Sequence, residues 1–315
     1  MTEATLPLFP DATLGCAEPA AESLGRHGDV EYLDMPAREI LNRNRDSRLP
    51  WQWTINPYRG CEFACSYCYA RYTHGYLGLD PRREFESRIF VKRGGREALE
   101  RKLRRASLRG ESIAIGTVTD PYQPAERHHG VTRSLLEALR GAAGLDLSIS
   151  TKSPLILRDL PLLAELDRRH TVTVNITVTT ADPELARRLE PQAPDPRARL
   201  RALARLAAEG IGTRLFCMPI LPRITEGGAV LAPLLEAARD AGAFDVVGAP
   251  LFLRTATRLR FWPWLRSEFP ELLPVYRRLY ARRSHLRRRE REEVLAEFRR
   301  LRLRFGFPAD RPGRV

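Results

Sequence analysis

Short β-rich runs alternate with helical patterns along most of this 315-residue chain, and this alternation constrains the fold more than any other feature. Strands that alternate with helices of ten or more residues predict right-handed βαβ units and a parallel sheet. Glycines such as Gly110, Gly210 and Gly242 mark the ends of several helical patterns. The expected strands are Gln52–Ile55, Ile113–Val118, Leu147–Thr151, Val172–Val178, Thr213–Met218 and Phe244–Gly248. The expected helices are, approximately, Gly95–Leu108, Thr132–Ala142, Leu155–Arg169, Arg197–Glu209 and Val230–Ala241.

Six such units fit between about Trp51 and Pro250, and they predict an α/β fold built on a partial (β/α)6 barrel. The alternative is a flat, doubly wound sheet with a nucleotide at its switch point, but no G-x-G-x-x-G follows the first strand. Barrels of this kind place their chemistry at the carboxyl ends of the strands. Residues that directly follow the strands are therefore the candidates for a functional site.

Three of the five cysteines follow the first expected strand at a C-x3-C-x2-C spacing, in the run NPYRGCEFACSYCYAR. Thiolates at Cys61, Cys65 and Cys68 would suit three irons of a cubane [4Fe–4S] cluster and leave the fourth iron open to a non-protein ligand. A structural zinc site needs a fourth ligand, and His74, Cys16 and Cys217 do not stand at a zinc-like spacing. A disulfide framework does not fit a long chain with an odd number of cysteines and no secretion signal.

Polar residues also end the later strands. Thr117, Thr119 and Asp120 end the second strand, and their hydroxyl and carboxylate groups would suit an ammonium group, although Asp120-Pro121 would also start a turn. Lys152 follows the third strand as one of only three lysines, and it would either pair with a carboxylate or extend into solvent. One face of the fourth strand carries Thr173, Asn175, Thr177 and Thr179, which would suit ribose hydroxyls or simply favour a strand.

Several segments together resemble one family, the spore photoproduct lyase-like branch of the radical S-adenosylmethionine (SAM) enzymes, and in particular its bacterial members outside spore formers. The resemblance runs from about Asn42 to Leu272. It implies a partial (β/α)6 barrel, a [4Fe–4S] cluster bound by the three cysteines, and SAM chelated by the open iron. The segments that carry it are NPYRGCEFACSYCYARYTHGYLG, GTVTDPYQPAE, STKSPLILRDLPLL, NITVTT and the PILPRITE region.

The resemblance also implies roles for individual residues. Thr119, Lys152 and Thr177 match positions that contact SAM, with Asp120 beside them. Tyr67 is the aromatic residue that precedes the last cysteine in radical SAM loops and packs over the cluster. Tyr69 matches a tyrosine that relays hydrogen in the lyases and is the expected catalytic residue.

The sequence departs from the lyases at one position. Where they carry a cysteine that donates hydrogen to the thymine radical, this chain has Val118, which has no thiol. Photoproduct repair is therefore not expected unless Cys217, near the end of the fifth strand, supplies the hydrogen. The other interpretation of Cys217 is a small buried hydrophobic residue.

The expected function is that of a radical SAM enzyme. It would cleave SAM reductively to a 5′-deoxyadenosyl radical, with an electron from a donor such as flavodoxin or ferredoxin. The radical would abstract hydrogen from an unidentified substrate, either a nucleic-acid base or a protein side chain. The alternative is a basic DNA- or RNA-binding protein with a structural or redox-sensing cluster.

The net charge of +13 leaves nucleic-acid binding open. The most basic segment, ARRSHLRRREREEVLAEFRRLRLRFG, also carries an apolar stripe of Val294, Phe298, Leu301 and Phe305, which favours a solvated amphipathic helix over the alternative of a helix that contacts phosphates.

We expect a flexible leader over residues 1–45, a radical SAM core over 46–255 and a C-terminal helical extension over 256–315 that covers the open side or base of the barrel. The sequence shows no signal peptide and no run long enough to span a membrane, so a cytoplasmic location with reduced thiols is expected.

Overall fold

Six adjacent parallel strands form the centre of the protein. The computed structural model describes residues 21–105 and 108–309. Its main sheet has seven strands in the order β11-β10-β9-β8-β7-β4-β3, of which only β3 is antiparallel to its neighbour. The parallel strands stand in chain order, whereas a doubly wound sheet reverses its order at a switch point, so the barrel prediction is confirmed. The strands are β3 (Leu41–Arg43), β4 (Trp53–Ile55), β7 (Ser112–Ile115), β8 (Asp146–Thr151), β9 (Thr171–Thr177), β10 (Gly212–Ile220) and β11 (Asp245–Pro250).

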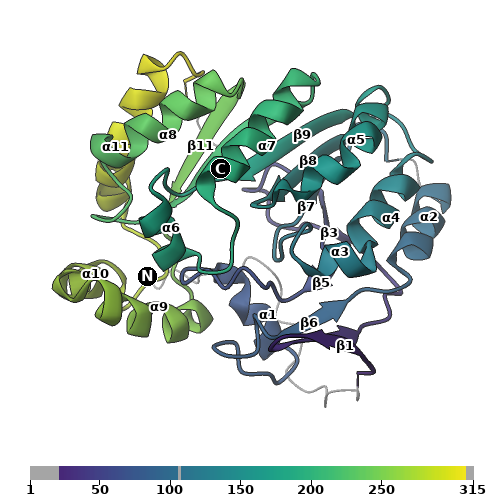
Figure 1. The fold of residues 1–315 in the computed structure, drawn as a ribbon, viewed down its shortest axis with the longest axis horizontal. Helices are drawn as coiled ribbons and strands as arrows, with labels where there is room; N and C mark the ends of the chain where they lie inside the picture. The colour runs from purple at the N-terminus through teal and green to yellow at the C-terminus, as the bar shows by residue number, and fades with distance from the viewer. Residues whose placement is uncertain (1–20, 106–107, 310–315) are drawn as a thin grey trace.

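Helices cover the outer face of this curved sheet (Figure 1). Alternate strand residues such as Val172, Val174 and Ile176 point to the helices and are at most 2% exposed, so they form the main hydrophobic core. All five expected helices are present, although the third begins as a 3-10 turn. The covering elements are α2 (Gly95–Arg105), α3 (Ala125–His129), α4 (Val131–Leu139), η2 (Pro154–Asp159), α5 (Leu160–Asp167), α6 (Pro183–Leu189), α7 (Pro196–Ala208) and α8 (Gly228–Asp240).

The inner face of the sheet is polar. Asn175 on β9 is fully buried and donates hydrogen bonds to the hydroxyls of Ser148 (2.8 Å) and Ser150 (3.2 Å) on β8. Thr173 and Thr177 lie on the same face of β9 as Asn175. The polar face predicted for the fourth strand is therefore directed into the barrel.

A second, four-stranded sheet precedes and flanks the barrel. Its order is β1-β2-β6-β5, with β2 and β6 parallel. The strands are β1 (Ser23–His27), β2 (Val30–Asp34), β5 (Tyr58–Arg59) and β6 (Arg88–Val91). The prediction of a flexible leader over residues 1–45 is wrong for residues 23–43, which contribute β1, β2 and β3. Residues 1–20, which include Cys16, lie outside the described residues.

The C-terminal helices continue from β11 and pack on two different places. Helix α11 (Arg288–Arg304) lies against α8 and β11 (Figure 1). Helix α9 (Thr255–Glu268) instead contacts η1 (Tyr69–Arg71) and α1 (Tyr72–Gly75), which follow the last cysteine. The 3-10 turn η3 (Pro270–Leu272) and helix α10 (Leu273–Tyr280) connect α9 to α11 along the chain. The stripe predicted on α11 faces the core, because Val294, Phe298 and Leu301 are buried. Arg289, Arg299 and Arg300 pair with glutamates of the same helix, whereas Arg302 pairs with Asp245 on β11 at 2.7 Å.

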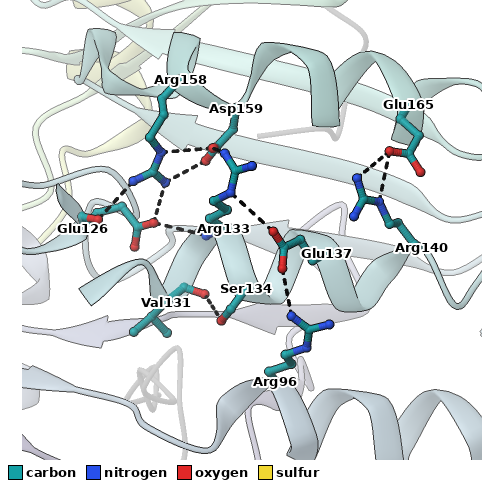
Figure 2. Close-up of polar contacts among 10 residues, drawn as sticks. All are labelled: Arg96, Glu126, Val131, Arg133, Ser134, Glu137, Arg140, Arg158, Asp159 and Glu165. Carbon is teal, nitrogen blue, oxygen red and sulfur yellow. Dashed lines mark hydrogen bonds and ion pairs between the residues drawn. The ribbon is translucent and has the colours of Figure 1, made fainter. Parts of the chain in front are cut away.

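A buried ion-pair network joins α3 and α4 to η2 (Figure 2). The carboxylates of Glu126 and Asp159 are fully buried, and Arg158 lies 2.7 Å from the first and 2.8 Å from the second. Arg133 reaches Asp159 at 2.7 Å, and the Tyr58 hydroxyl donates to Glu126 at 2.5 Å. The network therefore fixes three segments that lead to the carboxyl ends of the strands.

No helix in residues 21–105 and 108–309 is both long and apolar enough to cross a membrane.

Candidate active site at the cysteine loop

The cysteine loop begins with a glycine that no other residue could replace without rearrangement. Gly60 follows β5 with φ at +88°, a backbone conformation that favours glycine. A Cβ atom there would lie 2.9 Å from the Phe85 carbonyl oxygen and 3.0 Å from that of Arg88. The chain can therefore turn closely along β6 before it reaches Cys61, the first cysteine of the loop.

Backbone contacts from three directions hold the loop. The amide of Cys61 donates to the Phe85 carbonyl at 3.0 Å, and the amide of Ser66 donates to the Leu189 carbonyl at 2.9 Å. The Thr257 hydroxyl, from α9, donates to the Cys68 carbonyl at 3.2 Å. The loop is thus attached to the second sheet, to α6 and to the C-terminal extension.

The arginine that follows the loop is fully buried. Arg71 donates to the Cys65 carbonyl at 3.2 Å and forms an ion pair with Glu86 at 2.6 Å. Such a charge-assisted contact is stronger than a neutral hydrogen bond and fixes the turn between Cys65 and Cys68.

The three cysteines carry free thiols and lie among buried residues. Cys65 is buried and the other two are partly exposed. Burial raises the pKa of each thiol, to about 12 for Cys65, and Asp120 and the other two cysteines raise the pKa of Cys61 further. The thiols are therefore close enough to one another to interact electrostatically.

The turn after β7 lies directly beside the loop. Thr119 donates its hydroxyl to the Gly60 carbonyl at 2.6 Å. The Asp120 carboxylate accepts hydrogen bonds from the Thr151 hydroxyl (2.6 Å) and the Lys152 amide (2.7 Å) at the end of β8. Burial raises the pKa of Asp120, and these hydrogen bonds oppose that shift. Thr119 and Asp120 therefore join the ends of the first three parallel strands.

Lys152 is placed near the cysteine loop by a buried carboxylate. Its ammonium lies 3.8 Å from Glu190 and 5.8 Å from the centre of the Tyr67 ring. Glu190 also pairs with Arg199 at 2.5 Å and accepts hydrogen bonds from the hydroxyls of Tyr67 and Thr179. Although burial acts to raise the pKa of Glu190, Arg199 and Lys152 hold it below its usual range.

Tyr69 and Thr177 occupy the two sides of the site. The Tyr69 hydroxyl donates to the Thr117 carbonyl after β7, and its ring lies 6.2 Å from that of Phe252, which follows β11. Thr177 ends β9, and its carbonyl accepts a hydrogen bond from Arg199 at 3.2 Å. The structure thus brings Thr119, Asp120, Lys152, Thr177 and Tyr69 to the same end of the barrel.

The Radical SAM superfamily model matches residues 55–229, which is more than half of the chain. The chain belongs to the radical SAM superfamily. Members use a [4Fe–4S] cluster and SAM, and this protein is a radical SAM enzyme. The enzyme prediction is confirmed.

Sequence relatives include two uncharacterised proteins. One is Rv2578c of Mycobacterium tuberculosis, which is 41% identical over 82% of this chain and 76% of its own length. The other is MJ0683 of Methanocaldococcus jannaschii, 30% identical over 62% of this chain and 70% of its own length.

The fold is similar to that of spore photoproduct lyase. A variant of the lyase superposes with a TM-score of 0.65 at 16% identity over 87% of this chain and 79% of the lyase. A second variant, with bound SAM and dinucleoside spore photoproduct, gives a TM-score of 0.60 at 15% identity over 90% of this chain and 80% of the lyase. At this level of sequence identity, the structural similarity establishes only the fold of the protein.

The residues of the loop fit the cofactors that the superfamily uses. A cubane cluster gives each cysteine its own iron, and coordination deprotonates a thiol outright, which would offset the effect of burial on the three pKa values. Among the described residues, no three His, Cys, Asp or Glu side chains are placed to bind one single metal ion.

Three residues that support the site were not predicted from the sequence. Glu190, after α6, and Arg199, on α7, hold Lys152 and Tyr67. Asn56, directly after β4, donates to the Thr117 hydroxyl at 3.0 Å and accepts from the Val118 amide at 2.9 Å. Only the position of Asn56 at a strand end could have identified it.

Two residues considered as candidates lie away from the site or are engaged elsewhere. Cys217 is 1% exposed and packs in the core between the sheet and its helices, so it cannot act as a hydrogen donor inside the barrel. His74 donates to the Arg88 carbonyl (3.0 Å) and packs against Phe85 and Phe90, so it is not a fourth ligand of the loop.

Proposed function

We propose that Cys61, Cys65 and Cys68 bind the [4Fe–4S] cluster and that the radical SAM enzyme takes hydrogen from a nucleic-acid substrate at the mouth of the barrel. The observation that carries this proposal is the convergence of three free thiols with the ends of four parallel strands. The cluster, when bound and reduced, supplies the electron that cleaves SAM to methionine and the 5′-deoxyadenosyl radical that takes the hydrogen.

The chain's own residues would bind and orient SAM. Lys152 offers one ammonium to a carboxylate, and Glu190 keeps that ammonium charged and directed toward the loop. Thr119, Asp120 and Thr177 supply hydroxyl and carboxylate oxygens for the amino group and ribose. Tyr67 would pack over the cluster, since its hydroxyl is fixed by Glu190.

Tyr69 would act as the catalytic residue that passes hydrogen. Its hydroxyl lies at the end of β7 and beside Val118, where the lyases carry their donor cysteine. Because Val118 has no thiol and Cys217 packs on the other face of the sheet, this chain would not perform the lyase's own repair step. A reduced flavodoxin or ferredoxin would supply the electron, in a cytoplasm that keeps thiols reduced.

The support for nucleic acid is the net charge of +13 together with Arg254 beside the mouth, and a solved lyase neighbour is described with a dinucleoside spore photoproduct.

We take residues 46–255 as the catalytic core and residues 256–315 as its extension, since α9 contacts the segment after Cys68.

The test uses anaerobically reconstituted protein reduced with dithionite. We expect 5′-deoxyadenosine from SAM, and deuterium transfer into it from a perdeuterated DNA or RNA oligonucleotide. Cys65→Ala should lose iron, visible absorption and cleavage, whereas Cys217→Ala, the matched control, should keep all three because Cys217 is a core residue. Intact SAM in the wild type would instead favour a nucleic-acid-binding protein with a structural cluster, and cleavage without deuterium transfer would remove nucleic acid as the substrate.

A further inference from the structure

Two basic side chains lie on the face of the second sheet that carries Phe90, opposite the face that packs on the main core. In the β5–β6 pair, Tyr58 stands opposite Val91 and both are buried in the main core. Because side chains alternate along a strand, Arg59 and Lys92 point to the other face of the sheet. Both are only partly exposed, and the Lys92 amide donates to the Pro57 carbonyl at 3.2 Å, which holds the two segments together.

Neither of these cations has an acidic partner. Within residues 21–105 and 108–309, no ion pair joins Arg59 or Lys92 to a carboxylate. The carboxylates on the segment that leads into β6, Glu84 and Glu86, form ion pairs with other arginines. The pair is therefore a concentrated positive charge with no neutralising group nearby.

Partial burial of two like charges is unfavourable without a counter-ion. Burial and, to a smaller extent, the neighbouring Arg59 lower the pKa of Lys92 to about 8. An anion held between the two side chains would reverse both effects, since it would form charge-assisted hydrogen bonds to each. A site built in this way is suited to a dianionic or monoanionic oxygen group such as a phosphate.

The pair is connected to the barrel mouth through aromatic residues. Arg59 stands two residues before Cys61 on the segment that enters the cysteine loop, and Tyr72 and Tyr76, whose rings lie 5.5 Å apart, follow that loop. The Arg254 guanidinium lies 4.1 Å from the centre of the Tyr72 ring. The same guanidinium lies 6.0 Å from the centre of the Phe252 ring, which lies 6.2 Å from that of Tyr69, so the basic residues extend to the proposed catalytic tyrosine.

Aromatic rings between cations are suited to a nucleic-acid strand. Arginine binds phosphate with a planar fork, lysine binds it as a point charge, and bases stack on tyrosine rings irrespective of sequence. We propose that Arg59 and Lys92 bind a phosphate group of a nucleic-acid strand that runs past Arg254 and whose adjacent nucleotide reaches Tyr69. The choice of a nucleic acid as the ligand rests on the proposed function, whereas the position of the phosphate site follows from the unpaired cations.

The experiment measures binding of a fluorescent single-stranded oligonucleotide to the reconstituted full chain as salt is varied. The test variant is Arg59→Gln/Lys92→Met. The matched control is Arg104→Gln/Arg105→Gln, which removes the same charge from two exposed arginines of α2. Each phosphate neutralised on a single strand contributes about 0.7 to the slope of log K against log salt, so loss of this one phosphate contact should lower the slope by about 0.7. That change corresponds to about 5-fold weaker binding at 0.1 M salt.

The conservative variant Arg59→Lys/Lys92→Arg keeps the charge and should restore most of the binding. Iron content and thermal unfolding of each variant show whether the fold is kept, which matters because Arg59 precedes the cysteine loop. Equal weakening in the test and control variants would overturn the site and leave nucleic-acid binding intact as a general charge effect. If the wild type does not bind the oligonucleotide, both the phosphate site and the nucleic-acid substrate are overturned. Cleavage of SAM is measured without oligonucleotide, so it tests the radical SAM activity separately.

Discussion

The Lys152 ammonium lies 3.8 Å from the carboxylate of Glu190, a fully buried residue that also forms a 2.5 Å ion pair with Arg199. One carboxylate thus forms ion pairs with two cations, one at the end of β8 and one on α7. A buried charge is tolerated only when it is paired and hydrogen-bonded, and here Tyr67 and Thr179 complete the hydrogen bonds of Glu190. The residues that would bind SAM are therefore held in place by a group that need not touch it.

Glu190→Gln should destabilise the protein strongly. The substitution leaves Arg199, which is 1% exposed, without its counter-charge, and removal of one partner of a buried ion pair costs about 3–5 kcal/mol. Glu209→Gln is the control, since it breaks an exposed pair with Arg205 at 2.7 Å and should cost at most about 0.5 kcal/mol. Urea unfolding of the two variants measures the difference, and equal unfolding midpoints would contradict the buried-pair interpretation.

A similar contrast is expected within the network of Figure 2. Arg158→Met leaves the buried carboxylates of Glu126 and Asp159 with one fewer cation, and we expect a loss of about 3–5 kcal/mol in the free energy of unfolding. Arg140→Met removes the exposed pair with Glu165 and should cost no more than about 1 kcal/mol. Chemical denaturation checks both values. A small effect of Arg158→Met would show that Arg133 alone can satisfy the two carboxylates.

The parallel strands could be predicted from the sequence because each is a local apolar run followed by a helix. The second sheet could not be, since its strands are two to five residues long and β2 pairs in parallel with β6, more than fifty positions away in the chain. Residues 23–34 lack the apolar periodicity of a buried strand, and most of β1 remains exposed in the structure. Pairing between segments distant in the chain, and not local propensity, determines this part of the fold.

The residues of the candidate site also fall into those that could be predicted from the sequence and those that could not. Cys61, Cys65 and Cys68 were identified because their spacing is itself the signal, and Lys152 because it directly follows a strand in a chain that otherwise uses arginine. Glu190 and Arg199 carry no such signal, since each is an ordinary charged residue near the end or on the face of a helix. They support the site only because the folded barrel places Glu190 beside Lys152, Arg199 and Tyr67.

The dependence of the free energy of unfolding on pH should reveal the protonation of His74. Burial lowers its pKa to about 4, although its hydrogen bond to the Arg88 carbonyl opposes the shift. Because the folded-state pKa lies below the ordinary value of about 6.5, the neutral ring stabilises the fold above that value, and this contribution is lost as the pH falls toward 4. Between pH 7 and pH 5 the loss is about 2 kcal/mol.

His74→Gln separates this contribution from the other titrating groups. Glutamine keeps a donor for the Arg88 carbonyl but does not titrate, so the free energy of unfolding of the variant should fall less steeply between pH 7 and pH 5 than that of the wild type. Parallel pH profiles for the two proteins, measured by urea unfolding, would show that His74 does not carry the effect.

Lys152→Met should weaken SAM binding without loss of the cluster. A hydrogen bond to a charged group contributes about 1.5–3 kcal/mol, so the dissociation constant of SAM should rise by about 10- to 150-fold. Lys102→Met is the control, because Lys102 lies over the Trp53 ring at 5.2 Å on α2 and should leave the constant unchanged. Equilibrium dialysis with labelled SAM measures binding directly, and iron analysis confirms that the cluster is retained. Glu190 keeps its ion pair with Arg199 in the variant, so the fold should be preserved. An unchanged dissociation constant in Lys152→Met would mean that Lys152 supports the barrel end without contacting SAM.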